Sequence, residues 1–479
     1  MGQSQNKRVL VQYNFDLADL TDNNFEELYH QKRRDSFFAC AYTCGTRCYA
    51  LRDHLGGVPL YYRQTPYGLC FSTNLSDLVF DSDKFDRTGV EVFLRFGNTR
   101  LYPLIQSIGI VPPGSVVEFA PEQPPRIVYQ YVASPIDLPA RISMQDLVYE
   151  LDQRMRRAIE RVISHDPVGL YLSGGIDSAL IGIYLRELGV GVHAYTSAPW
   201  GKISSETPFA RQNASVIQAQ SHTVIELESD HYETLFRQLI SFYGAPHGTS
   251  TALGAVSLWA NTTIADMPQV FFGQNSDTVT CTVSAQYLTL VANYLPAFVR
   301  KRMHPAFAQS DLIARYLALG RKLVTGNPKL ASVKIREDLS PLQRVTLAGL
   351  YLAHSPSDSE VLSQPVIHRG QLISDPYFDV DVVEFLMAVP LRHRINVSRK
   401  SRLFVMLEKR VLQQLALRYL PADLVYRKKG FTVSLERDER AKRFLASLPL
   451  QFHGVEADTE EARFAAGVLR AWAKSKGLS

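Results

Sequence analysis

The chain has 479 residues, of which 46% are hydrophobic and 21% are charged, and its formal net charge is +5. This composition is typical of a globular protein of two or three domains, and it excludes a disordered or fibrous chain. The charge is too mild to predict a nucleic-acid partner, and no apolar run approaches the roughly 18 to 20 residues that span a bilayer. The start of the sequence lacks a signal-peptide core, so we expect a cytoplasmic protein with neither a membrane nor a nucleic-acid partner.

The N-terminal part of the sequence is rich in short apolar segments separated by turn residues. Such a pattern predicts a layered α+β domain over residues 1–130. The predicted helix covers residues 89–96. The predicted strands cover residues 9–13, 37–42, 47–51, 58–62, 68–72 and 116–119.

Three of the five cysteines, Cys40, Cys44 and Cys48, recur at intervals of four. Three thiols in this arrangement suggest a metal or iron–sulfur site. The same segment also predicts two strands around a turn at residues 43–46, in which the cysteines would be small buried residues of a hairpin. The hairpin is the favoured interpretation.

Prolines at five positions between residues 121 and 143 interrupt any periodic pattern and indicate a connecting segment. We therefore predict a linker at residues 131–143 and a second domain over residues 144–479. Apolar residues at helical spacing predict that this domain opens with a helix over residues 144–162.

The most informative stretch follows that helix. Residues 168–172 form an apolar run typical of a buried parallel strand, and it ends in Ser-Gly-Gly-Ile-Asp-Ser at residues 173–178. A helical pattern begins at Ser178, so the free amides of this loop would lie at a helix N-terminus and cradle phosphate groups. Asp177 could hold Mg²⁺ against the phosphates. The loop does not match the Walker pattern, which requires Gly-x4-Gly-Lys-Ser/Thr.

Further strands are predicted at residues 192–197, 223–227 and 269–272, with a helix at residues 209–218. Strands that alternate with helices predict a parallel sheet, whose ligands bind at the carboxyl ends of the strands. Three loops meet this condition, at residues 173–178, 197–199 and 273–277.

The C-terminal part of the sequence is predicted to be mostly helical, with helices at residues 380–389 and 400–418. A basic segment follows at residues 425–431, Val-Tyr-Arg-Lys-Lys-Gly-Phe. Residues 282–345 match no pattern that we can assign.

These motifs carry a resemblance to a known family. The loop at residues 173–178 resembles the pyrophosphate-binding loop of N-type ATP pyrophosphatases. Asp53 and the residues up to Tyr62 resemble the N-terminal signature of asparagine synthetases, as does the turn at residues 111–114. Residues 273–277 resemble the family motif Gly-x-Gly-Ser/Ala-Asp, with Asn275 in place of the second glycine. Residues 375–379 resemble the Pro-Phe-Leu-Asp segment, and residues 425–431 resemble the Arg-x-Lys-x-Gly-Phe loop.

The resemblance implies a degenerate Ntn-hydrolase-like N-terminal domain and a C-terminal ATP pyrophosphatase domain with a parallel sheet and a helical end. It also implies ATP and Mg²⁺ as cofactors, with Asp177 and Asp277 as the metal ligands. Lys428 or Lys429 would stabilise developing charge, Gln274 would take the position of a catalytic residue, and Glu206 resembles a further acid of the family. The residues expected to bind ATP are Leu172, Ser173, Gly174, Gly175, Asp177, Ser178, Ser197 and Gly273.

The sequence also departs from asparagine synthetase. Gly2 stands where the glutamine-dependent enzymes carry their nucleophilic cysteine, so we expect no glutaminase activity. In this respect the chain resembles β-lactam and carbapenam synthetases and lasso-peptide macrolactam synthetases. Gln274 replaces the catalytic tyrosine of the β-lactam enzymes, and their paired glutamate is missing near Leu372, which argues against β-lactam closure specifically.

We therefore expect an AMP-forming ligase that adenylates a small-molecule or peptide carboxylate and closes a lactam or macrolactam in natural-product or antibiotic biosynthesis. An intermolecular ligase that uses ammonia or another amine is one alternative. A non-catalytic nucleotide-binding partner of a biosynthetic protein is another.

Overall fold

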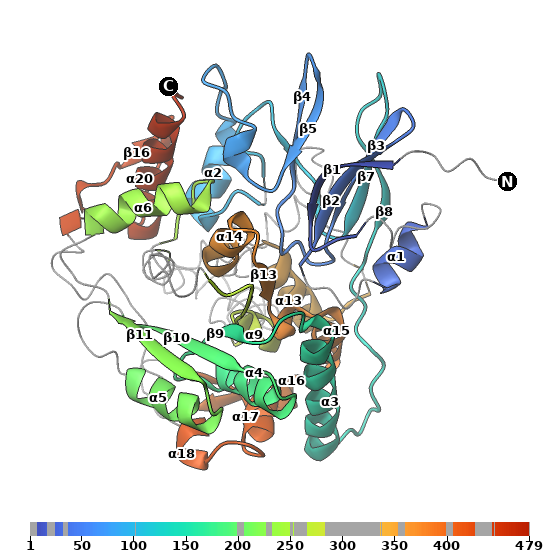
Figure 1. Ribbon diagram of the computed structural model, residues 1–479, viewed down its shortest axis with the longest axis vertical. Coiled ribbons are helices and arrows are strands. Elements are labelled where there is room, and N and C mark those ends of the chain that lie inside the picture. Colours follow the sequence, from blue (N-terminus) through green and yellow to red (C-terminus); the bar gives the residue numbers. More distant parts are fainter. Residues whose placement is uncertain are drawn as a thin grey trace, which may run out of the picture.

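The structure is a computed structural model. It describes residues 7–16, 24–31, 37–100, 102–198, 206–226, 232–249, 252, 266–282, 336, 338–352, 360–398, 406–426, 443–444 and 446–478. Figure 1 shows antiparallel strands of the N-terminal part in the upper half of the molecule and parallel strands with their helices in the lower half.

The N-terminal part is built on an antiparallel sheet of five strands in the order β1-β2-β3-β7-β8. The predicted hairpin is confirmed as β2 and β3, and Cys40 and Cys44 are buried within it. Burial raises the pKa of Cys40 to about 12, so its thiol stays protonated at neutral pH. The strands are β1 (Lys7–Tyr13), β2 (Ala39–Cys44), β3 (Arg47–Arg52), β7 (Ser115–Phe119) and β8 (Arg126–Gln130).

A second antiparallel sheet has the order β5-β4-β6, with β4 (Tyr61–Thr65), β5 (Gly68–Ser72) and β6 (Gly109–Ile110). The strand predicted at residues 58–62 is therefore misplaced, because β4 begins only at Tyr61. Val58 lies instead in a tight turn, where its amide donates to the buried carboxylate of Asp53. The predicted helix is confirmed as α2 (Arg87–Phe96), which Asp86 caps.

The C-terminal part contains a parallel sheet in the order β11-β10-β9-β12-β13. The chain enters at the central strand β9, adds β10 and β11 on one side, and then adds β12 and β13 on the other. The strand order therefore reverses between β9 and β12, which is where open α/β sheets bind ligands. The strands are β9 (Val168–Tyr171), β10 (Val192–Ala198), β11 (Ser221–Glu226), β12 (Gln269–Phe271) and β13 (Leu372–Ser374).

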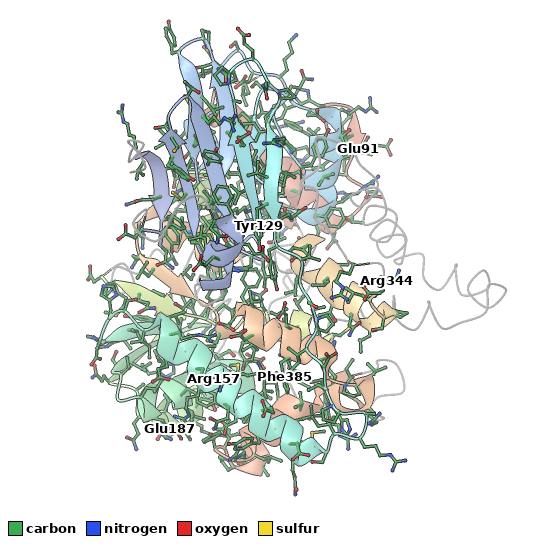
Figure 2. The ribbon with its side chains drawn as sticks, turned by 90° about the vertical axis from the view of Figure 1, so that its right-hand side faces the viewer. Glu91, Tyr129, Arg157, Glu187, Arg344 and Phe385 are labelled. Atoms are coloured by element: carbon green, nitrogen blue, oxygen red, sulfur yellow. The ribbon has the colours of Figure 1, made fainter. Side chains whose placement is uncertain are left out.

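Helices pack around this sheet, and the predicted mixed α/β fold with a parallel sheet is confirmed (Figure 1). The helix α3 opens with a capping box made by Ser143 and Asp146. Phe385 of α15 is buried in the layer where α15 packs on α3, whereas Arg157 of α3 is exposed (Figure 2). The main helices are α3 (Met144–Val162), α4 (Ile176–Glu187), α5 (Thr207–Val216), α15 (Val380–Ala388) and α17 (Arg410–Ala416).

The helix predicted over residues 400–418 is wrong at residues 406–409, and residues 400–405 lie outside the described residues. Residues Met406–Lys409 form β15, which pairs with β14 (Ile395–Ser398), and α17 begins only at Arg410. Pairing with a neighbouring strand outweighs the helical spacing of the apolar residues here.

The C-terminal helix α20 (Glu460–Ser475) packs on α2 of the N-terminal part, and Trp472 donates from its indole nitrogen to Ser76 Oγ at 2.9 Å. Figure 1 shows α20 and α6 next to α2, far from the parallel sheet. The remaining elements are α1 (Phe25–Gln31), α6 (Tyr232–Tyr243), α9 (Ser276–Thr280), α13 (Pro341–Leu352), α14 (Glu360–His368), α16 (Leu391–Arg394), α18 (Ala422–Val425), β16 (Gln451–Phe452) and β17 (Val455–Glu456), with the 3₁₀ turns η3 (Leu75–Asp77) and η8 (Pro376–Phe378).

The two parts of the chain are joined by specific contacts. The Tyr13 hydroxyl donates to the carbonyl of Gln371 at 2.9 Å and accepts from the amide of Ile373 at 3.2 Å. Because β13 is an edge strand, this hydroxyl satisfies backbone groups that a neighbouring strand would otherwise bind. The Phe37 ring stacks on Phe378 of η8, with the ring centroids 5.4 Å apart.

Candidate functional site

The loop after β9 is closed by its own serines. The Ser173 amide donates to Ser178 Oγ at 3.0 Å, and the Gly175 amide donates to Ser173 Oγ at 3.0 Å. Gly175 is the N-cap of α4, and no side chain in the described part of the molecule caps this helix. The first amides of α4 are therefore available to an anion, and the dipole of the helix favours negative charge there.

Asn213 of α5 holds this loop from behind, and the sequence motifs did not identify it. Its Nδ2 lies 3.1 Å from the carbonyl oxygen of Ser173 and 3.3 Å from that of Gly175, and its side chain is buried. The signal in the sequence is a polar residue at helical spacing with Ala210 and Ala214, on the face of α5 that is buried. Asn213 fixes the carbonyls of the loop, so the loop amides keep a defined direction.

The loop after β12 lies next to residues 173–178, which we call the phosphate loop. The two loops are adjacent because β12 and β9 are parallel neighbours, with Phe271 opposite Leu170. Asp177 lies in the first turn of α4, and Asp277 lies in the first turn of α9. The chain therefore brings together two carboxylates that are 100 residues apart in sequence.

Lys409, at the end of β15, lies between these carboxylates. Its Nζ is 2.5 Å from Asp177 Oδ2, 3.0 Å from Asp277 Oδ1 and 2.7 Å from Ser276 Oγ. The ammonium group is buried and pairs with both acids, so its single positive charge offsets half of their combined formal charge. The sequence analysis missed this lysine, because it lies in no recognisable motif and in a segment that was assigned to a helix.

The donor atoms at this position fit Mg²⁺. Asp177 Oδ1 is buried and has no hydrogen-bond partner among the described residues. Asp277 Oδ1 lies 3.0 Å from Lys409 Nζ and accepts from Thr282 Oγ1 at 2.8 Å. No group of three or more His, Cys, Asp or Glu side chains gathers to form a metal site in the described part of the chain. Two carboxylates, with phosphate oxygens and water for the other positions, are a usual ligand set for Mg²⁺.

A third carboxylate, that of Asp375, lies behind the loop after β12. Asn275 donates to Asp375 Oδ2 from its Nδ2 at 2.7 Å and from its backbone amide at 3.2 Å. The pKa of Asp375 is raised to about 7, chiefly by burial; the hydrogen bonds from Asn275 and from the Tyr377 amide oppose this shift, and the nearby charge of Asp177 adds to it. The asparagine that replaces a glycine of the family motif therefore has a specific partner.

The other predicted residues contribute in different ways. Leu172 is buried and offers its backbone, since its amide donates to the carbonyl of Tyr195 and its carbonyl accepts from Thr196 Oγ1. Ser197 is half-buried near the carboxyl end of β10. Gly174 is buried within the phosphate loop, and Gln274 is exposed on the loop after β12.

Close packing around position 273 favours a glycine there. A Cβ atom at this position would lie 3.1 Å from Ile181 Cδ1 and 3.2 Å from Tyr377 Cε2, so these two side chains would have to shift by a few tenths of an ångström. Glu206 is buried at the N-terminus of α5. Lys428 and Lys429 lie outside the described residues.

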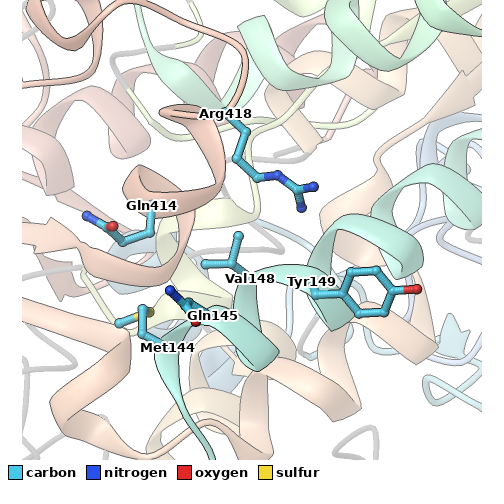
Figure 3. A pocket seen from close by; sticks show the side chains of 6 residues that line it. All are labelled: Met144, Gln145, Val148, Tyr149, Gln414 and Arg418. Atoms are coloured by element: carbon cyan, nitrogen blue, oxygen red, sulfur yellow. The ribbon is translucent and has the colours of Figure 1, made fainter.

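A separate pocket of about 310 Å³ lies between α3 and α17 (Figure 3). Met144, Val148 and Tyr149 line it from α3, and Gln414 and Arg418 line it from α17 and the residues that follow. No residue predicted to bind ATP or metal is among the residues that line this pocket.

The chain was compared with known proteins. The family model described as asparagine synthase matches residues 150–347 and 375–462, which together make up more than half of the chain. The matched ranges include both candidate metal ligands, Lys409 and the segment with Lys428 and Lys429. No curated protein matches the chain. Within the described residues, no helix is both long enough and apolar enough to cross a membrane.

Proposed function

Because the chain belongs to the asparagine synthase family, whose members are ATP-dependent ligases that form carbon–nitrogen bonds, we propose that it adenylates a substrate carboxylate and joins the acyl group to an amine. The products of this reaction are an amide, AMP and pyrophosphate. We propose that the amine belongs to the same substrate, so that the product is a lactam or macrolactam of a natural product or peptide. We also propose that the reaction takes place in the cytoplasm.

One observation carries this proposal. The phosphate loop and two aspartates from separate strands converge on Lys409 where the strand order of the sheet reverses. A nucleoside triphosphate and its metal are typically bound by free helix amides, paired carboxylates and an ammonium group.

The first step requires the nucleotide to be held with its α-phosphorus exposed to the substrate. The amides at the N-terminus of α4 would bind phosphate oxygens, and Ser173 Oγ would release the Gly175 amide to do so. Asp177 and Asp277 would hold Mg²⁺, which neutralises charge on the pyrophosphate as it leaves. Lys409, displaced from the carboxylates, would turn its ammonium group to the same phosphate oxygens.

The carboxylate oxygen of the substrate attacks the α-phosphorus, and the bond to the bridging oxygen of pyrophosphate breaks. The amine nitrogen then attacks the acyl carbon, AMP leaves, and the nitrogen loses a proton. Gln274 cannot accept this proton because an amide does not titrate, so its role would be to orient a substrate by hydrogen bonding. We propose Lys428 or Lys429 as the group that stabilises the oxyanion.

The absence of glutaminase activity is part of the proposal and is supported by Gly2 at the position of the family nucleophile. An intermolecular ligase that takes ammonia or a separate amine is the alternative that retains the same site. A nucleotide-binding protein without catalysis is disfavoured because the chain keeps both candidate metal ligands, Asp177 and Asp277, together with the lysine segment at residues 425–431.

The test is substrate-dependent release of pyrophosphate from ATP and Mg²⁺ across a panel of carboxylates and linear peptides, in the absence of glutamine. Asp177→Asn should abolish the release. Asp146→Asn, in the exposed capping box of α3, serves as the matched control and should retain it. A cyclic product whose mass is lower than that of its linear substrate by one water would identify the intramolecular reaction. Nucleotide binding that is unaffected by Asp177→Asn, with no turnover on any substrate, would refute the ligase.

A further inference from the structure

Two polar side chains, Asn275 and Asp375, form a pair that is fully shielded from solvent next to the candidate metal site. Both the side-chain and the backbone nitrogen of Asn275 donate to one oxygen of Asp375, Oδ2. Asn275 lies two residues before Asp277, so this pair fixes the backbone from which one candidate metal ligand projects.

The second oxygen of Asp375 acts on the other loop. Oδ1 accepts from the amide of Tyr377 at 3.0 Å, and the Tyr377 hydroxyl donates to the backbone carbonyl of Asp177 at 3.1 Å. The Tyr377 ring also packs against Gly273, as the close approach to a Cβ at that position indicates. One carboxylate is therefore linked to the loops of both Asp177 and Asp277.

We propose that Asp375 is a positioning residue that sets the separation of the two Mg²⁺-binding aspartates through Asn275 on one side and Tyr377 on the other. This inference rests on the proposed function, since it concerns the metal–nucleotide site of that ligase. It explains why an asparagine stands at position 275, where the family motif has a glycine.

A purely structural role for Asp375 would not require a carboxylate. Asp375 is also the N-cap of η8, but a cap requires only one acceptor oxygen, which serine or asparagine supplies equally well. The oxygen that does not cap η8, Oδ2, accepts two hydrogen bonds from Asn275, and a buried carboxylate is expensive to desolvate. Partners that orient metal ligands typically change metal affinity by roughly 10- to 100-fold when they are removed.

The experiment measures binding of α,β-methylene-ATP by calorimetry in MgCl₂ and in EDTA. Asn275→Ala and Asp375→Ser, which keeps the cap of η8, should weaken binding roughly 10- to 100-fold in MgCl₂ and leave binding in EDTA little changed. The reciprocal swap, Asn275→Asp with Asp375→Asn, restores a side-chain hydrogen bond and should recover part of the loss. Asp152→Asn is the matched control, because Asp152 is a buried carboxylate that accepts from Tyr184 and Arg418, away from the site.

The outcomes separate the two proposals. If the wild-type protein binds the nucleotide with Mg²⁺ and the Asn275 and Asp375 variants bind it equally well, the positioning role is overturned and the ligase is unaffected. Equal weakening with and without Mg²⁺ also overturns it, because the variants would then disturb the nucleotide site as a whole. If Asp375→Ser does not fold, Asn275→Ala alone decides, since it leaves the carboxylate in place. A wild-type protein that binds no nucleotide with Mg²⁺ overturns both proposals.

Discussion

Replacing Lys409 with methionine removes one positive charge and leaves Asp177 and Asp277 facing each other. The Asp177 side chain is only 14% exposed, whereas that of Asp277 is 40% exposed and retains part of its hydration. Truncating one partner of a buried ion pair costs about 3–5 kcal/mol, and the exposure of Asp277 lowers this to roughly 2–4 kcal/mol. For a chain of this size we expect the apparent Tm without metal to fall by roughly 2–6 °C.

The distinctive part of the prediction is its dependence on Mg²⁺. If the two aspartates bind the cation, Mg²⁺ takes over the neutralising role of the ammonium group, and it should raise the Tm of Lys409→Met more than that of the wild type. Differential scanning fluorimetry over a MgCl₂ series measures this difference. Arg418→Met is the control, because it removes a cation from the buried Asp152, which has no other carboxylate beside it among the ion pairs of the described residues. An equal response to Mg²⁺ in the wild type and Lys409→Met would refute the reasoning.

Three further predictions concern other contacts. Asn213→Leu removes the amide that orients the phosphate loop, so KM for ATP in the pyrophosphate-release assay should rise roughly three- to tenfold; an unchanged KM would remove Asn213 from the site. Tyr13→Phe leaves the amide of Ile373 without its acceptor, so the urea midpoint should fall by the equivalent of about 1–3 kcal/mol, and an unchanged midpoint would show that this contact does not join the two parts. Burial raises the pKa of Asp379 from 3.8 to about 6, although the Arg161 guanidinium, 2.5 Å from Asp379 Oδ2, opposes the shift. The protonated form of Asp379 therefore contributes stability that is complete below pH 4 and lost as the pH rises through 6. Asp379→Asn should flatten that loss, which is at most about 3 kcal/mol, in Tm measurements from pH 4 to 7, and an identical profile would contradict the shift.

The fold was largely predictable where local pattern and tertiary structure agree. The strand β9 and the helix α3 follow directly from an apolar run and from apolar residues at helical spacing. The strand β13 was not predicted, because three residues are too few to show a period. In β15 the pattern was misleading, since apolar residues at helical spacing were drawn into pairing with β14.

The site was predictable only where a motif is contiguous. Asp177 and Asp277 were identified because each lies in a segment that resembles a family motif and follows a predicted strand. The rule for parallel sheets places such loops side by side. Lys409 and Asn213 reach the same loops from elements that carry no motif, so only the three-dimensional arrangement could identify them. Asn275 was noticed as a departure from the family pattern, but the contact that explains it is with the carboxylate of Asp375, 100 residues away.

The same arrangement gives the N-terminal part a structural role that does not depend on glutaminase activity. Phe37 of that part stacks on Phe378, in the turn η8 that holds Tyr377, and its ring also lies 6.1 Å from that of Phe272, which precedes the loop after β12. Removing an aromatic side chain from such a position costs about 3–5 kcal/mol, because the surroundings close only partly around the cavity. The N-terminal part therefore contributes a wall against which η8 and the loop after β12 are packed. Selection for a rigid metal–nucleotide site would preserve this wall whether or not the domain ever releases ammonia.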